Sequence, residues 1–388
     1  MTAKRVPSRA VLAVLGAVAA AGVLAGCAAG TAPAEPAAPA PAVTVPLATS
    51  MTTATSQAWA IVAMGGSAAA EDRFWELFTR LPGGSQWKLD TPPGVADNGG
   101  LVASGSSGAL TVAFEPSQDL VFSPLAQTGN GGKTWDAGLL NASMAAVPDA
   151  LAADSTAMLA LLHNGAIDQA ATGQAASGNW ARLAAPGTVA ASTAGRACQV
   201  TGLTAVAYTP SGTPLAGASC ARQGSAGIFA RVAGTWRATG PDVPAGQSVK
   251  VVRLTQTADD DTALLQATAK SGASLLAAWT GDGTKWTVSP SLPLRGGRVL
   301  ASGTGSGGAV WVLLSGDRAE ILTAPGATWQ ELPAPPPGTA ALVAGSGGTD
   351  DALAVSGGTL TVYRLAQGSV AWTKSQAIQV PIAYGSSS

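Results

Sequence analysis

Short apolar stretches alternate with turns rich in glycine, serine, proline and aspartate along almost the whole chain after residue 47. One unit shows the pattern well: apolar stretches at 298–303 (RVLASG), 309–314 (AVWVLL) and 319–325 (AEILTAP) follow one another through short turns. Polar and apolar residues alternate strictly from Thr359 to Tyr363, which is typical of a strand with one buried face. Glycine and proline are evenly dispersed, so the pattern predicts many short strands in a single domain.

A tryptophan recurs after a glycine-rich or polar turn, at intervals of 43 to 56 residues. Its positions are Trp87, Trp135, Trp180, Trp236, Trp286, Trp329 and Trp372. Three apolar strands precede the tryptophan in a unit, and the polar strand that it opens is the fourth. Four antiparallel strands in a repeat of this length are the signature of a propeller blade. We therefore predict an all-β fold, a seven-bladed β-propeller over residues 47–388, with the tryptophans packed between blades.

The two ends of the repeat region leave a choice open. The first unit has no clear opening strand before Trp59, whereas residues 377–384 form a strand-like surplus at the C-terminus. That surplus would complete the first blade in a Velcro closure, and residues 43–50 (VTVPLATS) compete for the same place. Residues 67–81 have apolar positions at helical spacing, but their second half aligns with a third strand, so we expect a helical insertion followed by a strand.

The first 26 residues have the composition of an export signal. Lys4, Arg5 and Arg9 precede a wholly apolar or small stretch at 10–25, which is short for a membrane span. Leu24-Ala25-Gly26-Cys27 follows and resembles the bacterial lipobox, in which the peptide is cut before a lipid-modified cysteine. The resemblance implies lipidation of Cys27, with an ordinary signal peptide or an uncleaved anchor as the alternatives.

Residues 27–46 are rich in proline and alanine, and this composition predicts a disordered, extended tether between Cys27 and the propeller. Without residues 1–26 the net charge is −4, and no basic cluster of the size that nucleic acid requires is present. We expect a monomer that contacts the lipid membrane through acylated Cys27, on the extracytoplasmic face.

Cys198 and Cys220 are the two cysteines that remain after Cys27. They flank a predicted hairpin with its turn at 209–212, and an exported protein meets an oxidising compartment. The even pair predicts a disulfide across the hairpin; two buried free thiols are the alternative.

Two of the turns before a tryptophan carry a recognisable motif. Residues 128–135 (TGNGGKTW) resemble the Asp-box, with Asn130 at the aspartate position, and 280–286 (TGDGTKW) is a version one residue shorter. The Asp-box is typical of sialidase-like and related BNR-repeat propellers, so the resemblance implies that fold. The arginine triad and the paired tyrosine and glutamate of sialidases find no matching positions, and we assign no catalytic residue.

The rest of the sequence offers little chemistry. His163 is the sole histidine and lies beside a turn at Asn164-Gly165, and the aspartates at 154, 259–261 and 350–351 are interpreted as turn caps in preference to a calcium site. No pattern indicates a cofactor or metal. The leading hypothesis is a non-enzymatic binding or assembly scaffold of the cell envelope, whose partner is an envelope protein or a glycan. The alternative is a divergent glycan-active enzyme, a sialidase-like hydrolase or lyase.

Overall fold

The computed structural model describes residues 41–43, 48–52, 57–65, 73–92, 101–106, 109–114, 122–139, 148–172, 179–222, 224, 226–243, 247–256, 260–344 and 349–381. All of them belong to one compact unit, residues 38–388. The expected signal peptide, Cys27 and most of the expected tether lie outside the described residues, as does the expected helical insertion at 67–72.

The strands follow one another in runs of four that we call quartets. The first three are β1 (Ala48–Thr52), β2 (Ala58–Gly65), β3 (Arg73–Arg80) and β4 (Trp87–Leu89); β5 (Leu101–Ser106), β6 (Ala109–Phe114), β7 (Phe122–Thr128) and β8 (Asp136–Leu139); and β9 (Pro148–Ala153), β10 (Ala157–Leu162), β11 (Ile167–Ala171) and β12 (Ala181–Ala184). The fourth is β13 (Val200–Tyr208), β14 (Pro214–Cys220), β15 (Ile228–Val232) and β16 (Thr235–Ala238), preceded by the helices α1 (Thr188–Ala191) and α2 (Thr193–Cys198).

The remaining quartets complete the chain. They are β17 (Ser248–Gln256), β18 (Asp261–Ala269), β19 (Gly272–Thr280) and β20 (Thr287–Val288), with β21 (Leu292–Pro293) also on β19; β22 (Val299–Thr304), β23 (Val310–Leu314), β24 (Arg318–Leu322) and β25 (Gln330–Glu331), with the 3-10 turn η3 (Ser306–Gly308); and β26 (Thr339–Ala344), β27 (Asp350–Ser356), β28 (Thr359–Leu365) and β29 (Thr373–Gln379).

Within each quartet, neighbouring strands pair antiparallel in chain order. Some quartets merge into larger sheets: β1 pairs parallel with β22, and β14 pairs with β17. The sequence pattern explains the strands. In β28 the apolar Leu360 and Val362 are buried while the polar Thr361 between them is half-buried.

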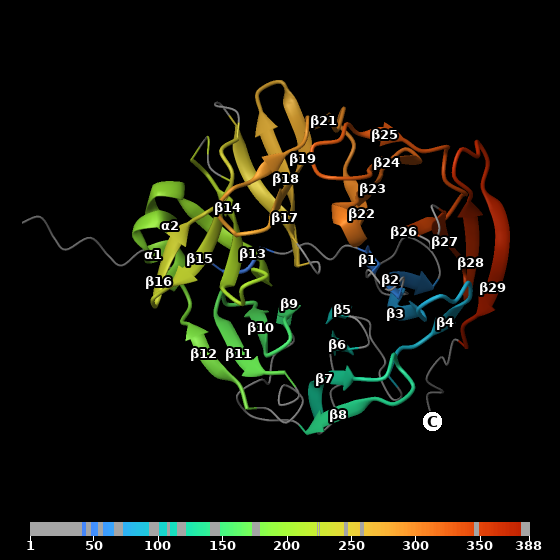
Figure 1. Cartoon of the computed structure of the whole chain (residues 1–388), viewed down its shortest axis with the longest axis horizontal. Coiled ribbons are helices and arrows are strands. Elements are labelled where there is room, and N and C mark those ends of the chain that lie inside the picture. The colour runs from blue at the N-terminus through green and yellow to red at the C-terminus, as the bar shows by residue number, and fades with distance from the viewer. Residues whose placement is uncertain are drawn as a thin grey trace, which may run out of the picture. The chain divides into compact units, whose positions relative to one another are not determined.

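The quartets stand side by side around a common centre (Figure 1). Buried apolar side chains fill the junction between each described quartet and the next, and a further cluster joins the last quartet to the first through Leu353, Val362, Phe78 and Trp87. Antiparallel four-stranded sheets packed face to face around a centre are the β-propeller architecture. The expected all-β propeller is therefore confirmed, apart from the two short helices.

The innermost strand of the first quartet comes from the N-terminus. β1 pairs with β2, and the hydroxyls of Ser50 and Thr52 donate to the carbonyls of Leu342 (2.5 Å) and Ala344 (2.9 Å) on β26. The expectation that residues 377–384 complete the first blade is wrong, because β29 ends at Gln379 and pairs with β28 in the last quartet. The competing segment 43–50 supplies part of β1 instead.

An arginine binds three inner strands together. Arg253 on β17 donates to the carbonyl of Ser302 on β22 (2.8 Å) and to that of Ser50 on β1 (3.0 Å). Burial lowers its pKa to about 10. The guanidinium therefore stays charged at neutral pH, and backbone carbonyls take the place of water around it.

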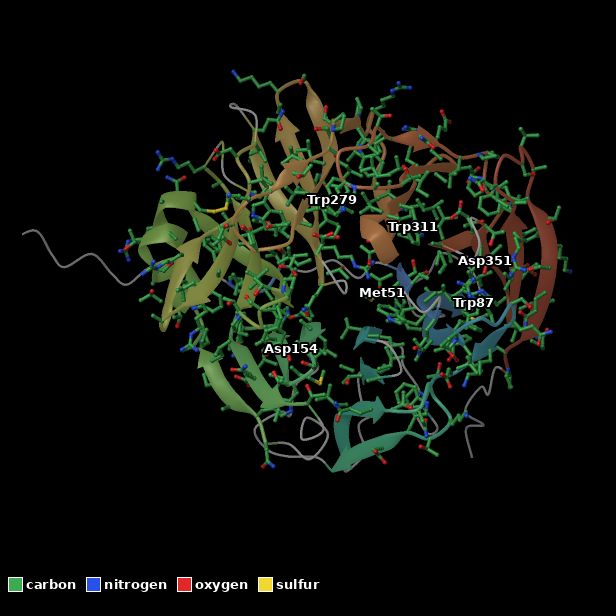
Figure 2. The ribbon with its side chains drawn as sticks, in the orientation of Figure 1. Met51, Trp87, Asp154, Trp279, Trp311 and Asp351 are labelled. Carbon is green, nitrogen blue, oxygen red and sulfur yellow. A yellow bond between two sulfur atoms is a disulfide. The ribbon has the colours of Figure 1, made fainter. Side chains whose placement is uncertain are left out.

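A buried polar cluster closes the junction between the last and first quartets. Asp351 on β27 is fully buried, and one of its oxygens accepts from Arg80 and from the indole of Trp87 (2.9 Å), while Arg364 donates to the other (3.0 Å). Arg80 also donates to the carbonyl of Ala344 (2.8 Å) and lies over the Trp87 ring at 5.3 Å from its centroid. Figure 2 shows Trp87 and Asp351 at this junction. We call these residues the closure cluster.

Replacing Asp351 by alanine leaves the buried guanidinium of Arg80 without a counter-charge. We expect the free energy of unfolding in urea to fall by about 3–5 kcal/mol. The R80M/D351L double variant should recover most of this loss, since two apolar side chains leave no buried charge. Glu331→Ala, at an exposed position of β25, is the control, and a loss no larger than in that control would contradict the assigned role.

Candidate functional site

The recurring tryptophans open the fourth strands, as the sequence predicts. Each stands at the first residue of a fourth strand, immediately before one, or one residue inside it. The indole N–H groups of Trp286, Trp329 and Trp372 donate to the carbonyls of Thr239 (2.6 Å), Pro290 (3.0 Å) and Pro333 (3.0 Å). These acceptors lie within two residues of the end of the fourth strand of the preceding quartet, so the tryptophans bind neighbouring quartets together.

Trp135 follows the same rule with a side chain as acceptor. Its indole donates to the carboxyl of Asp90, which follows β4, and Asp90 also accepts from Thr79 (2.8 Å) and Lys88 (3.1 Å). Gly132 stands against this carboxyl at φ +79, where an added Cβ would lie 1.8 Å from Asp90 Oδ2. The glycine of this motif is therefore required by the close approach of the two quartets.

The two motif turns are held by side chains. The Asn130 Oδ1 accepts from the backbone N–H of Thr134 (3.0 Å), and Asp282 Oδ1 accepts from those of Thr284 and Lys285 (both 2.8 Å). These hydrogen bonds to the ionised form hold the pKa of Asp282 well below its usual range. Because both side chains accept hydrogen bonds within their own turns, the motif is explained by local structure.

The acidic residues interpreted as turn caps have three different roles. Asp154, labelled in Figure 2, does cap its turn and accepts from the backbone N–H groups of Thr156 and Ala157 (both 2.6 Å). Asp351 belongs to the closure cluster, so that interpretation is wrong for it. The side-chain oxygens of Asp261 are both buried and accept no hydrogen bond from any described residue, so it does not cap a turn among them.

Burial, aided by the nearby Asp260 carboxyl, raises the pKa of Asp261 from 3.8 to about 8. The folded protein thus keeps this proton up to about pH 8, whereas the unfolded chain releases it near pH 4. The unfolded state binds fewer protons across that window, so stability decreases as the pH rises through it.

The Asp261→Asn variant should remove this decrease, because an amide has no proton to lose. We expect its free energy of unfolding to exceed that of the native chain at pH 8 by on the order of 2 kcal/mol, and to approach it at pH 4. Urea titrations at both pH values measure the difference, with Glu331→Gln as control. Parallel pH profiles for native chain and variant would contradict a protonated, buried Asp261.

His163 lies on the surface with 85% of its side chain exposed, and its Nδ1 is 3.5 Å from Asp149 Oδ2. Its carbonyl accepts from the N–H of Ala42, whose neighbour Val43 donates to Leu203 on β13 (2.7 Å). Three residues of the expected tether thus belong to the folded body, at the junction of the third and fourth quartets. Among the described residues, no cluster of three or more His, Cys, Asp or Glu could hold a metal, and no helix could cross a membrane.

The fourth quartet departs from the repeat. α1 and α2 precede β13, and Ser192 caps α2 by accepting from the N–H of Gly195 (2.9 Å). A disulfide joins Cys198, the last residue of α2, to Cys220 at the end of β14, with 5.3 Å between the Cα atoms. The expected disulfide is present, but it fastens a helix to the sheet and does not cross two strands.

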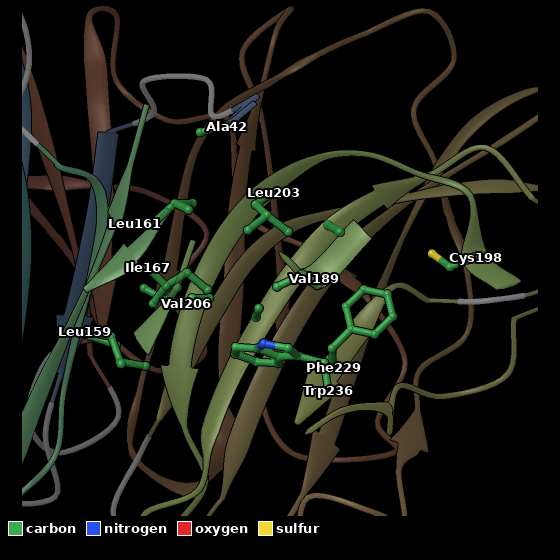
Figure 3. Packing of buried hydrophobic residues seen from close by; sticks show 14 of the residues in the cluster. Ala42, Leu159, Leu161, Ile167, Val189, Cys198, Leu203, Val206, Phe229 and Trp236 are labelled. Atoms are coloured by element: carbon green, nitrogen blue, oxygen red, sulfur yellow. The ribbon is translucent and has the colours of Figure 1, made fainter. Parts of the chain in front are cut away.

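An open groove of about 700 Å³ lies between these helices and the outer strand β16. Its lining includes Thr188, Thr193, Arg196, Thr235, Trp236 and Arg237. Trp236 is buried in the cluster that joins the third and fourth quartets, together with Val189 of α1 and Ala42 (Figure 3). We call this feature the quartet-4 groove, and it is the candidate binding site of the described residues.

The pattern of apolar positions does not predict this groove. Helices of four and six residues are too short to produce a recognisable apolar period. The serine cap is one signal in the sequence, and charge is another. Between Asp168 and Asp242 the chain has five arginines and no acidic residue or lysine, although the whole chain is slightly acidic.

Removing the disulfide should loosen the groove. The C198A/C220A variant loses a cross-link between residues 22 apart, and we expect the free energy of unfolding to fall by about 3 kcal/mol. A reducing agent should lower the stability of the native chain to that of the variant and leave the variant unchanged. Equal stability of the oxidised native chain and the variant would contradict this.

Comparison with known proteins supports the fold. No protein-family model and no curated protein matches the chain. Among solved structures, a protein from Lactobacillus plantarum matches with a TM-score of 0.53 and 10% identity, over 84% of this chain and 97% of that one. YCF48 from Cyanidioschyzon merolae (TM-score 0.47, 13% identity, 81% and 94% covered) and YCF48 bound to a D1 peptide (0.47, 15%, 86% and 99%) are also similar. At such identities the likeness concerns the fold alone.

Proposed function

We propose that this protein is a lipid-anchored, seven-bladed β-propeller that serves as a non-catalytic binding scaffold on the extracytoplasmic face of a cell membrane. The observation that carries the binding role is the quartet-4 groove. The repeat residues of the other quartets are engaged in junctions and turns, whereas the fourth quartet adds two helices and a disulfide and leaves an open groove between them. A departure from the repeat that leaves an open groove on a rigid support is typical of a binding site.

The quartets support the blade count. Each described quartet has a tryptophan at the start of its fourth strand, and each junction, including that from last to first, has its own apolar cluster. We infer that every quartet is one blade and that the ring closes through β1 and the closure cluster. The side-chain-held turns at Asn130 and Asp282 support an Asp-box, BNR-type repeat within that ring.

Lys4, Arg5, Arg9, the apolar stretch and Leu24-Ala25-Gly26-Cys27 support the anchor. Several acyl chains on one cysteine hold a protein at a membrane stably, whereas a single chain holds only marginally. Localisation at the cell envelope follows from this anchor. The partner presented to the groove is an envelope component, either a protein or a glycan or a lipid.

A glycan-active enzyme would need two cooperating carboxyl groups about 5 to 9.5 Å apart. The described carboxyls with raised pKa have structural surroundings: Asp90 binds Thr79 and Lys88, Glu76 binds Thr91, and Asp261 is sealed from solvent. Burial and the neighbouring Asp351 raise the pKa of Asp350 to about 6, but Asp351 is held by two arginines. This arrangement favours the scaffold.

Replacing Cys27 by serine should release the protein from the membrane, because the hydroxyl does not accept the lipid. We expect the variant in the soluble fraction of cells that express the full chain, without incorporation of a labelled fatty acid and with unchanged unfolding of the domain. The C198A/C220A variant, which retains Cys27, is the control and should stay in the membrane fraction.

Two results would overturn the proposal. Retention of the Cys27→Ser variant in washed membranes would show an uncleaved anchor in place of a lipid. Hydrolysis or elimination of any glycan by the purified domain, abolished by substitution of a carboxyl residue, would replace the scaffold by an enzyme.

A further inference from the structure

Trp236 departs from the bonding rule of the recurring tryptophans. The indoles of Trp286, Trp329 and Trp372 all donate to the chain that follows the preceding fourth strand. In the part of the chain that the structure describes, the indole N–H of Trp236 has no acceptor, and it is not sealed from solvent. The preceding quartet ends at Ala184, where the chain turns toward α1, and Trp236 lines the groove instead.

The groove also holds two arginines with no carboxylate partner. Arg196 on α2 donates to the carbonyl of Ala191, and Arg237 on β16 makes no ion pair with any described residue. No acidic residue is among the described residues that line the groove, and Thr188 and Thr193 line it together with the two arginines. The side chains that line this concave site therefore include two cations, hydroxyl groups and one indole, but no carboxylate.

The tether enters the body at the same junction. Ala42 belongs to the same apolar cluster as Trp236 and Val189, as Figure 3 shows. Ala42 follows Cys27 by fifteen positions, a separation that a fully extended chain would span over about 50 Å. A lipid on Cys27 would therefore keep the junction that carries the groove within reach of the membrane surface.

We propose that the quartet-4 groove binds the phosphate of an anionic phospholipid headgroup. Guanidinium groups match phosphate oxygens with paired hydrogen bonds, and a neutral indole N–H adds a third donor. An anionic leaflet attracts basic residues close to its surface. This inference names the ligand of the site in the proposed function, and places the fourth blade against the membrane while the other blades face away from it.

The test uses residues 27–388 with Cys27→Ser, which contains the whole compact unit and has no lipid of its own. Co-sedimentation is measured with phosphatidylcholine vesicles that contain or lack phosphatidylglycerol. We expect binding only with phosphatidylglycerol, and a loss of about 30-fold in affinity for R196Q/R237Q. R295Q/R298Q makes the same change of charge at two exposed arginines outside the groove and should bind as the parent does.

A second variant separates binding from folding. Trp236→Phe keeps an aromatic ring in the core and removes the donor, so it should weaken vesicle binding while its thermal unfolding stays close to that of the parent. Equal binding by R196Q/R237Q and R295Q/R298Q, or binding of inorganic phosphate without binding of phosphatidylglycerol vesicles, would overturn the proposal. Neither result depends on whether Cys27 is lipidated, so the anchored scaffold is tested separately.

Discussion

The junction between the last and first quartets depends on one buried carboxylate. A propeller is stable only when its last blade meets its first, because an open ring would expose two sheet faces whose apolar side chains need a partner. Among the described strands, the C-terminal strand β29 pairs within the last quartet and does not join the first. Asp351 instead gathers Arg80, Arg364 and Trp87 from both sides of the junction, and its complete burial makes each of these bonds costly to break.

Other junctions between quartets are held by a weaker interaction, a hydrogen bond from a tryptophan indole. An indole N–H reaches across each of several junctions to a backbone carbonyl or, at Asp90, to a carboxyl. Such bonds satisfy a buried donor and fix the angle between neighbouring sheets. The junction before the fourth quartet is the exception, since the helices and the disulfide stabilise it from outside and leave Trp236 free for another acceptor.

The sequence repeat predicts much of the fold, and the features that it does not predict also have physical reasons. The tryptophans located the fourth strands because each follows a turn whose glycines and Asx residues are visible in the sequence. The sequence does not distinguish the role of Asp351 from that of Asp350. Alternation along a strand places the two side chains on opposite faces of the sheet, but it does not show which face meets Arg80, 271 residues away in the chain. The segments 43–50 and 377–384 have similar strand character, so pattern alone could not choose between them. The helices beside the groove are too short to produce a detectable apolar period in the sequence.

The position of β1 imposes an order on folding. This strand is made first, yet its hydroxyls bond to β26, whose residues lie 292 positions further along the chain, and its outer edge pairs with β22. Contacts of such sequence separation form slowly, because a long loop must close before they contribute any stability. The N-terminal strand therefore keeps an unpaired edge until most of the chain has been synthesised. For that interval the nascent protein is exposed to aggregation and to proteases, and we expect its survival to depend on chaperones.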